Sequence, residues 1–391
     1  MRHYFLACGL ALLFFSVSSC KPTPQTEEET TGADNAGIQQ GIYRYYTGTI
    51  GDLAVGLHLC MRHRTNPDGL KETFYYGFYW YDNYQEPILI EGSPDSTGKT
   101  VLMEYGSGDN SPEWLIDALD AQVLTGTWKR SNELPIQLKA VAQPAGSVAF
   151  TCAGLMGETK LRPDDPNSPG AITSLSTLWP QGINDPALDQ FLRAEIAGGI
   201  LGDSASTVFS SAADLLKKQQ DEFVAAYQKD MSEFVEDTTT FSEDNKYMYS
   251  YDLQSDVSVV WNQNNLLSLA FFTYVFSGGA HGNYATGLAS YDLSKKQLLG
   301  INDVFKPGFE ATLDAALEKS LRNKFGLAAK APLTEVLFEE SFSYTDNFCL
   351  TGKGIIFNYP PYEIAAYAVG EIKLFVPFSD VTSVLQPAFA K

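Results

Sequence analysis

Apolar and polar residues alternate in short runs between about 37 and 160, and turn residues recur about every 8–12 positions. This spacing, without helical periodicity, predicts an all-β antiparallel meander that closes into a barrel or folds into a sandwich. The expected strands are 43–49, 53–61, 73–81, 88–91, 100–105, 114–119, 123–130 and 135–141.

The predicted strand at 73–81 is aromatic on both faces. Because successive side chains of a strand point to opposite sides, we expect one face in the core and the other partly covered. Gly77, in the middle of this strand, predicts a β-bulge or a close approach of another backbone.

A stretch rich in Pro, Asp and Ser at 162–170 interrupts this pattern. We interpret it as an interdomain linker, which gives a β domain at 37–160, a linker at 161–172 and a second domain at 173–391. Each of the two domains is expected to hold its own apolar core.

Helical spacing is found only in the second domain. A helix capped by Asp185 is expected to begin at Pro186, a longer one covers about 211–235, and a third at 308–325 ends at Gly326. The expected strands are 246–253, 257–262, 266–277, 287–292, 341–350, 354–358 and 372–377. This order predicts an α+β domain with helices packed on an antiparallel sheet.

The N-terminus carries a positive residue, Arg2, then an apolar stretch at 5–15 and small residues before Cys20. The apolar stretch is too short to span the roughly 30 Å of a bilayer core, so it predicts a cleaved signal. It resembles a bacterial lipoprotein signal at 1–19 with Cys20 as the lipidated residue. The alternative is an ordinary signal that leaves Cys20 free.

Residues 20–36 are acidic and contain no large apolar side chain after Cys20, which predicts a flexible tether. We therefore expect a protein that is lipid-anchored in the cell envelope of a Gram-negative bacterium. The expected membrane is the outer one, with the protein facing the periplasm or the cell surface.

The formal net charge is −20 over 391 residues. This charge opposes binding to nucleic acid, whose phosphates require Lys and Arg. It suits a cationic partner or simply keeps an exported protein soluble, and the composition leaves both interpretations open.

Three cysteines lie outside the predicted signal and anchor: Cys60, Cys152 and Cys349. No spacing rule selects a pair among them, and we predict no essential disulfide. A metal site at His58, Cys60 and His63 is not expected, because His63 falls on the opposite face of the strand and no fourth ligand is near. We predict no metal and no cofactor.

Two motifs could carry a binding function. The loop at 277–284 presents His281, Asn283 and Tyr284 after two glycines, and the segment at 360–370 presents Tyr362 and Glu363 after two prolines. Such loops contact ligands or simply make tight connections. His281 and Glu363 would suit an acid/base pair if they met, and a structural Tyr-Glu-His cluster is the alternative.

Four stretches in order, 183–188, 277–284, 299–305 and 361–370, resemble the extracytoplasmic domain shared by RsiV-type anti-sigma factors and the non-catalytic region of PdaC-type peptidoglycan deacetylases. The resemblance covers about 173–391 and implies an α+β fold with a role at the cell envelope. In the RsiV branch it implies recognition of lysozyme, a basic protein.

These observations predict a non-enzymatic envelope lipoprotein that binds a macromolecule, either a lysozyme-like basic protein or a cell-wall glycan such as peptidoglycan. No G-x-S-x-G or H-E-x-x-H motif supports a hydrolase. The alternative is a glycan- or peptidoglycan-modifying enzyme that uses a carboxylate such as Glu363 as acid or base.

Overall fold

The computed structural model describes residues 37–65, 71–105, 111–202, 208–235, 240–242 and 244–390. The predicted signal, Cys20 and the tether, all within 1–36, lie outside these residues. Among the described helices, none is both long and apolar enough to cross a lipid bilayer.

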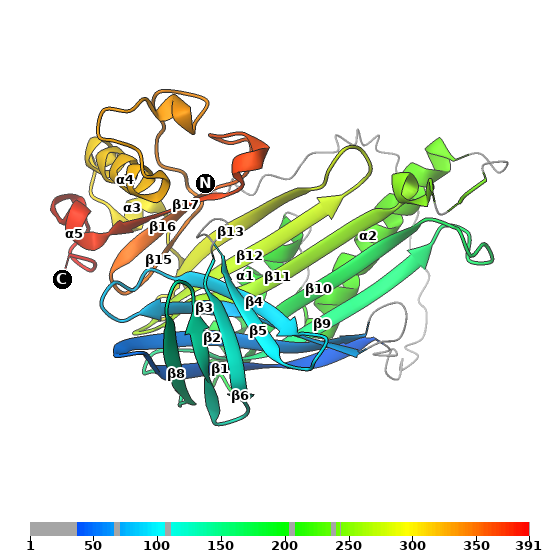
Figure 1. The fold of residues 1–391 in the computed structure, drawn as a ribbon, viewed down its shortest axis with the longest axis horizontal. Helices are drawn as coiled ribbons and strands as arrows, with labels where there is room; N and C mark the ends of the chain where they lie inside the picture. Colours follow the sequence, from blue (N-terminus) through cyan, green and yellow to red (C-terminus); the bar gives the residue numbers. More distant parts are fainter. Residues whose placement is uncertain are drawn as a thin grey trace, which may run out of the picture.

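The first eight strands form a closed antiparallel barrel (Figure 1), which confirms the predicted meander and decides against the sandwich. Each strand pairs with the next, and β1 also pairs with β8 at its C-terminal end, so the sheet closes on itself. The strands are β1 (Ile38–Ile50), β2 (Leu53–Thr65), β3 (Lys71–Tyr81), β4 (Ile88–Pro94), β5 (Thr100–Tyr105), β6 (Glu113–Leu119), β7 (Val123–Lys129) and β8 (Glu133–Ala140).

Alternate side chains of these strands fill the barrel with apolar and aromatic groups. The carboxylate of Glu104 is buried among them, and its Oε1 accepts three hydrogen bonds. The donors are Tyr79 Oη at 2.6 Å, Trp114 Nε1 at 2.9 Å and Trp128 Nε1 at 2.7 Å. These bonds offset much of the cost of placing a polar group in an apolar interior.

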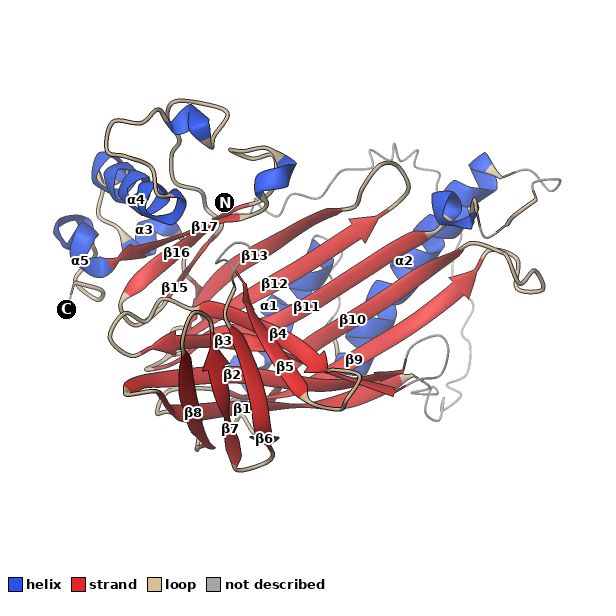
Figure 2. Cartoon of the chain, in the orientation of Figure 1, coloured by secondary structure: helices blue, strands red, loops and turns tan. Residues whose placement is uncertain are grey.

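Six further strands continue from β1 and are called the main sheet below: β9 (Ala149–Lys160), β10 (Gly170–Gln181), β11 (Tyr251–Gln263), β12 (Leu266–Phe276), β13 (Asn283–Asp292) and β14 (Gln297–Leu298). Its neighbours are antiparallel except β10 and β11, which run parallel. A parallel pair needs a long crossover connection. The helices α1 (Pro186–Leu201) and α2 (Ala212–Phe234) supply it and cover one face of the sheet (Figure 2).

Local chemistry explains where α1 begins and which face it buries. The side chain of Asp185 accepts hydrogen bonds from the backbone N–H groups of Ala187 and Leu188, as an N-cap does. Leu192 and Ile196, one turn apart, are buried against the main sheet. The predicted helix and its cap are therefore confirmed.

The stretch at 162–170, expected to be an interdomain linker, forms the turn between β9 and β10 instead. These two strands pair along their length, from Gly170↔Lys160 to Gln181↔Ala149. The chain leaves the barrel between β8 and β9, upstream of the expected boundary. Composition does not separate the two cases, because a tight turn and a linker both favour Pro, Asp and Ser.

The C-terminal part forms a small antiparallel sheet with α4 (Glu310–Phe325) packed against it. Its strands are β15 (Phe348–Leu350), β16 (Gly354–Tyr359) and β17 (Ile372–Pro377), and the short helices α3 (Ile301–Val304) and α5 (Phe378–Val381) flank it. As predicted, α4 ends at Gly326, whose φ of 65° is left-handed. Only β15 forms within the expected strand 341–350. The expected strands 246–253 and 257–262 form one strand, β11, and a 3₁₀ turn, η3 (Lys246–Tyr249), precedes it.

The outer wall of the barrel packs against the main sheet, and β3 provides much of the contact. Tyr79 points into the barrel, whereas Tyr76 and Phe78 join core clusters with residues of the main sheet. The ring of Trp80 lies 4.9 Å from that of Trp261 on β11. Both faces of this aromatic strand are thus buried, so the apolar interior is continuous from barrel to main sheet.

Replacement of Gly77 by Ala is expected to lower the free energy of unfolding by roughly 1–3 kcal/mol. A Cβ at Gly77 would lie 1.9 Å from the backbone carbonyl oxygen of His58, and that strand cannot move without breaking its pairing. Chemical denaturation measures the change. Gly198→Ala in α1 is the control, since nothing lies within 4 Å of its added Cβ, and a small gain is expected there. Equal stability of the Gly77 variant and the native protein would contradict the close approach.

Candidate functional site

The loop between β12 and β13 presents His281 to solvent. Gly278 and Gly279 have φ values of 87° and 96°, a backbone conformation that residues with a Cβ rarely adopt. Gly282 sits against the ring of Tyr274, so a Cβ there would lie 2.4 Å from it. The glycines of this motif therefore shape the loop that carries His281.

The segment after β16 presents Tyr362 to solvent, with 55% of its surface exposed. Its φ of 70° is left-handed, which is unusual for a bulky residue. Two backbone hydrogen bonds, from Tyr362 N to Ala365 O and from Glu363 N to Pro360 O, hold this turn at 3.1 Å each. A 3₁₀ turn, η5 (Tyr367–Val369), follows it.

The loop and this segment meet through four ring side chains, called the aromatic cluster below: His281, Tyr284, Tyr362 and Tyr367. The ring of His281 stacks on that of Tyr367 with 4.1 Å between centroids, and Tyr284 meets Tyr367 edge-on at 5.8 Å. Tyr362 Oη lies 3.3 Å from His281 Nε2. Tyr367 Oη donates to the Gly282 carbonyl oxygen at 2.8 Å, which ties the two segments together.

Three of the five predicted ligand-binding residues, His281, Tyr284 and Tyr362, thus lie in one cluster. Asn283 is exposed beside them at the start of β13, where it pairs with Val275. Glu363 hydrogen-bonds to Thr345, and burial raises its pKa while that bond opposes the rise. No bond between Glu363 and His281 is found in the described part of the chain.

Tyr367 is the member of the cluster that sequence reasoning did not single out. It lies five positions after Tyr362 in the same motif. The motif therefore included this residue, but its sequence did not indicate which residues Tyr367 contacts. Tyr367 contacts His281 and Gly282 because the fold places the loop at 277–282 beside the η5 turn.

A largely buried carboxylate, Glu371, connects the two segments that carry the cluster. Burial opposes its charge, yet Lys373, Asn358 and Thr286 hold its pKa below the usual range. Its Oε2 accepts from Thr286 Oγ1 at 2.8 Å and pairs with Lys373 Nζ at 3.1 Å, and Asn358 Nδ2 donates to Oε1 at 3.0 Å. Because Thr286 is on β13 and Asn358 on β16, the network joins the two sheets that carry the aromatic cluster.

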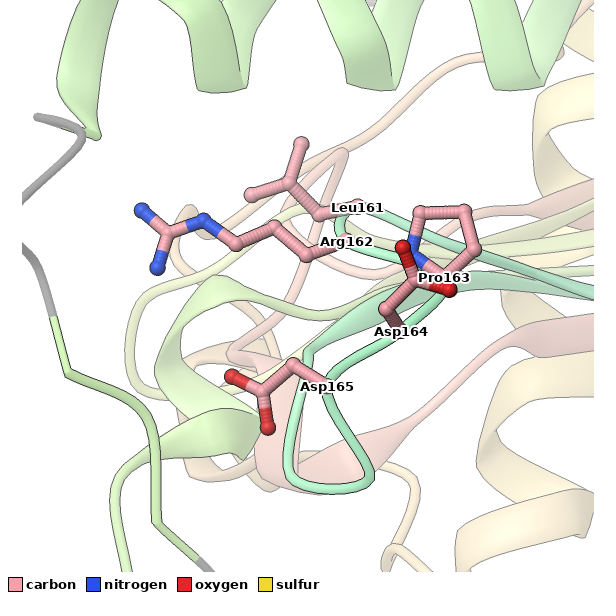
Figure 3. Close-up of a pocket in the computed structure, with 5 residues that line it drawn as sticks. All are labelled: Leu161, Arg162, Pro163, Asp164 and Asp165. Atoms are coloured by element: carbon pink, nitrogen blue, oxygen red, sulfur yellow. The ribbon is translucent and has the colours of Figure 1, made fainter.

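A separate hollow lies at the β9–β10 turn (Figure 3), lined by Leu161, Arg162, Pro163, Asp164 and Asp165. Arg162 and Asp165 extend toward the same side, and the Arg162 guanidinium lies 4.7 Å from the Phe241 ring centroid. One turn alone forms this hollow, and none of the predicted site residues lines it. The geometry therefore gives it no part in the candidate site.

The residues that suggested a metal site, His58, Cys60 and His63, have structural surroundings. The ring of His58 is buried between Tyr45 and Trp80, and its Nδ1 lies 2.9 Å from Tyr43 Oη. Burial lowers the pKa of His58 to about 3. Over the described ranges, no group of three His, Cys, Asp or Glu side chains is arranged to hold a metal ion.

Comparisons with known proteins place two family matches in this part of the chain. Residues 170–284 match the family described as deacetylase PdaC, and residues 302–379 match a family described as a protein of unknown function, DUF3298. His281 and Tyr284 fall in the first match, and Tyr362 and Tyr367 in the second. The PdaC-type resemblance of the C-terminal half is thereby confirmed.

One curated relative is the peptidoglycan-N-acetylmuramic acid deacetylase PdaC of Bacillus subtilis, which is 24% identical over 177 residues. This alignment spans 44% of the chain but only 36% of that protein. The crystal structure of a DUF3298 family member from Bacteroides fragilis has a TM-score of 0.53 and 22% identity, and covers 61% of this chain and 95% of that one. A DUF3298 protein of Pseudomonas aeruginosa has a TM-score of 0.43. The Bacteroides structure supports the fold.

The stability of the protein is expected to depend on pH through His58. Between about pH 6 and pH 4 the unfolded chain binds a proton at this residue and the folded protein does not. The free energy of unfolding should therefore fall by about 1 kcal/mol per pH unit on acidification. Denaturant titrations of the native protein and of His58→Gln across this range should differ in slope by that amount.

His63→Gln is the matched control for this experiment, because His63 is on the same strand but exposed. Its profile should follow that of the native protein. Parallel profiles for the native protein and His58→Gln would contradict the neutral, buried state of His58.

Proposed function

We propose that the protein is a cell-wall-related extracytoplasmic binding protein and that the aromatic cluster binds a glycan. The observation that carries this proposal is the group of four contacting rings at an exposed junction of two segments, with His281 and Tyr362 open to solvent. The similarity to a peptidoglycan deacetylase, in a region that includes the loop of His281, supports a cell-wall ligand.

Stacked rings suit a sugar for a physical reason. The face of an aromatic ring carries negative charge density, and the C–H groups on one face of a pyranose ring are apolar and slightly positive. Tyr Oη, His281 nitrogen and the Asn283 amide add donors and acceptors at the edge of the same surface. Apolar area with a few placed polar groups is the usual composition of a specific binding site.

The backbone of Tyr362 supports a functional role for this residue. A left-handed conformation costs a residue with a Cβ roughly 1–2 kcal/mol, a cost that Gly would avoid. A Tyr here is therefore unfavourable for the fold alone. Strain of this kind is concentrated at binding and catalytic sites, where surrounding contacts hold it in place.

The cellular location belongs to the same proposal. A lipid on Cys20 and the acidic segment at 20–36 would tether the folded part to an envelope membrane, where a glycan layer is within reach. Metabolic labelling with a fatty acid tests the anchor: label on the native protein and none on Cys20→Ser is the expected result. Equal labelling of both, or of neither, would exclude lipidation at this residue.

Replacement of Tyr362 or Tyr367 by Ala is expected to weaken binding to peptidoglycan by about tenfold or more, since loss of one anchoring ring costs ~1.4 kcal/mol or above. Co-sedimentation with insoluble peptidoglycan measures it. Tyr84→Ala is the matched control, because this Tyr is 72% exposed on the barrel and distant in sequence from the cluster. Equal loss for all three variants, or no binding by the native protein, would contradict the proposal.

Tyr362→Gly separates the ring from the backbone. It should bind peptidoglycan as weakly as Tyr362→Ala does. Its midpoint of unfolding should lie at a denaturant concentration at least as high as that of Tyr362→Ala, because glycine adopts the left-handed turn without strain. If Tyr362→Gly retained full binding, the ring would not be the contact that matters.

A basic protein of the lysozyme type is the second candidate ligand, and the net charge of −20 favours it. The two ligands differ in their response to salt. Binding to a basic protein should fall steeply as salt rises from about 50 to 500 mM, whereas ring stacking on a neutral sugar should change little. A salt-sensitive complex that survives Tyr362→Ala would favour the protein ligand over the glycan.

Glu363→Gln tests the enzymatic alternative. Since the carboxylate bonds to Thr345, the variant is expected to leave peptidoglycan binding within about twofold of the native value. Product analysis of peptidoglycan incubated with each protein completes the test. A product released by the native protein and absent with Glu363→Gln would establish an enzyme and overturn the non-enzymatic proposal.

A further inference from the structure

Two buried cysteines lie against each other where the barrel meets the main sheet. Cys60 on β2 and Cys152 on β9 are 3% and 0% exposed, and their Sγ atoms are 2.9 Å apart. A disulfide bond is ~2.05 Å long, so a displacement of under about 1 Å would bring the two sulfurs to bonding distance. They are 92 positions apart in the sequence, which is why no spacing rule selected them.

The path of β1 explains how side chains from two non-adjacent strands come together. β1 lies between β2 and β9, pairing Tyr43 with Cys60 and Gly41 with Cys152. A Cβ at Gly41 would lie 2.9 Å from the Cβ of Cys152 and 2.5 Å from the Met61 carbonyl oxygen. The missing side chain at Gly41 leaves the space across which the two thiols meet.

The pair is closed off from solvent. Both cysteines belong to the core cluster that contains Tyr43, Tyr76 and Phe150. Burial, together with the neighbouring Cys60, raises the pKa of the Cys152 thiol. The folded protein therefore disfavours the thiolate that thiol–disulfide exchange requires, so a bond between the two would have to form before the core closes.

We propose that Cys60 and Cys152 form a disulfide that links the barrel to the main sheet when the protein folds outside the cytoplasm. One S–S bond forms and two S–H bonds break. The two electrons and two protons pass to a disulfide-bearing oxidant, a small-molecule disulfide or a dithiol–disulfide oxidoreductase, whose own disulfide is reduced to two thiols. The inference rests on the extracytoplasmic location in the proposed function, because only an oxidising compartment retains such a bond.

The link would join parts of the chain that pack as one unit but are far apart in sequence. The closed loop runs from β2 to β9 and so includes β3 to β8, most of the barrel. Closing so long a loop restricts the unfolded chain strongly. Reduction is therefore expected to lower the melting temperature by about 5–10 °C.

Cys349 supplies a matched control. It is also fully buried, yet its surroundings are the apolar side chains Phe78, Val260, Ala270, Leu288 and Ile356 rather than a second thiol. In the folded arrangement it is expected to stay reduced under conditions in which the other two are linked.

The test uses the full chain exported with its own leader. The protein is denatured without reductant, its free thiols are alkylated, and its peptides are identified by mass spectrometry. The expected result is a linked pair of peptides carrying Cys60 and Cys152, with Cys349 alkylated. Alkylation of both Cys60 and Cys152, or a link from either of them to another cysteine, would overturn the proposal.

Melting experiments on the oxidised protein and on protein that was unfolded and refolded in reductant add a second readout, because reductant does not reach the buried pair in the folded state. The native protein and Cys349→Ser should both lose stability on reduction, whereas the double variant Cys60→Ser/Cys152→Ser should not respond. A native protein whose melting temperature is unchanged by reductant would count against a stabilising link even if the linked peptides were found.

Peptidoglycan co-sedimentation of the same samples keeps the two proposals apart. Binding to peptidoglycan without the Cys60–Cys152 link would overturn the proposed disulfide and would not contradict the proposed glycan site. The link without binding has the opposite meaning, since it supports the disulfide and overturns the aromatic cluster as a glycan site.

Discussion

The ion pair between Arg62 of β2 and Asp256 of β11 lies at the contact on which the arrangement of the molecule depends. Arg62 Nη2 is 3.2 Å from Asp256 Oδ1, and the Arg side chain is only 4% exposed. Its guanidinium lies over the rings of Phe74 and Tyr76. Asp256 also accepts a hydrogen bond from Ser176 Oγ on β10. Such a pair contributes little net stability, but loss of Asp256 would leave the buried Arg62 guanidinium without this carboxylate, at a cost of about 3–5 kcal/mol.

Further polar contacts join the barrel to the main sheet beside this ion pair, and β1 also pairs directly with β9. Asn262 Nδ2 of β11 donates to Tyr43 Oη of the barrel strand β1 at 3.4 Å. The small sheet then fits into the angle between barrel and main sheet, where Phe78, Val260 and Ile356 share one cluster. Lys353 Nζ donates to the carbonyl oxygens of Asp82 and Asn83 at the turn after β3.

Periodicity predicted the elements well because each depends on local chemistry. The eight barrel strands, the cap at Asp185 and the left-handed end of α4 at Gly326 all follow from residues within a few positions of one another. Their assembly depends on distant contacts that no local pattern contains. The turn at 162–170 was interpreted as a linker because turns and linkers share this composition. The strands on either side of it, β9 and β10, were not predicted, so the parallel β10–β11 pair was not expected either.

The candidate site shows the same division. Sequence reasoning selected His281, Tyr284 and Tyr362 because glycines and prolines beside rings indicate shaped loops. Tyr367 was missed, and the acid/base pairing of Glu363 with His281 was left open, because side-chain direction depends on the turn at Tyr362. The left-handed φ there, together with the hydrogen bond from Tyr367 to Gly282, decides which rings meet. Neither can be read from spacing.

The barrel is packed with its own side chains. An eight-stranded barrel is just wide enough either to be filled by its own side chains or to hold one small ligand. Here the interior is filled: Trp114 and Tyr79 are buried in it, and both donate to Glu104 Oε1 with Trp128 as a third donor. The outer face of β2 and β3 packs against the main sheet. The proposed glycan site is instead on the surface where β12, β13 and the segment after β16 meet, within the part of the chain that is similar to the PdaC and DUF3298 families.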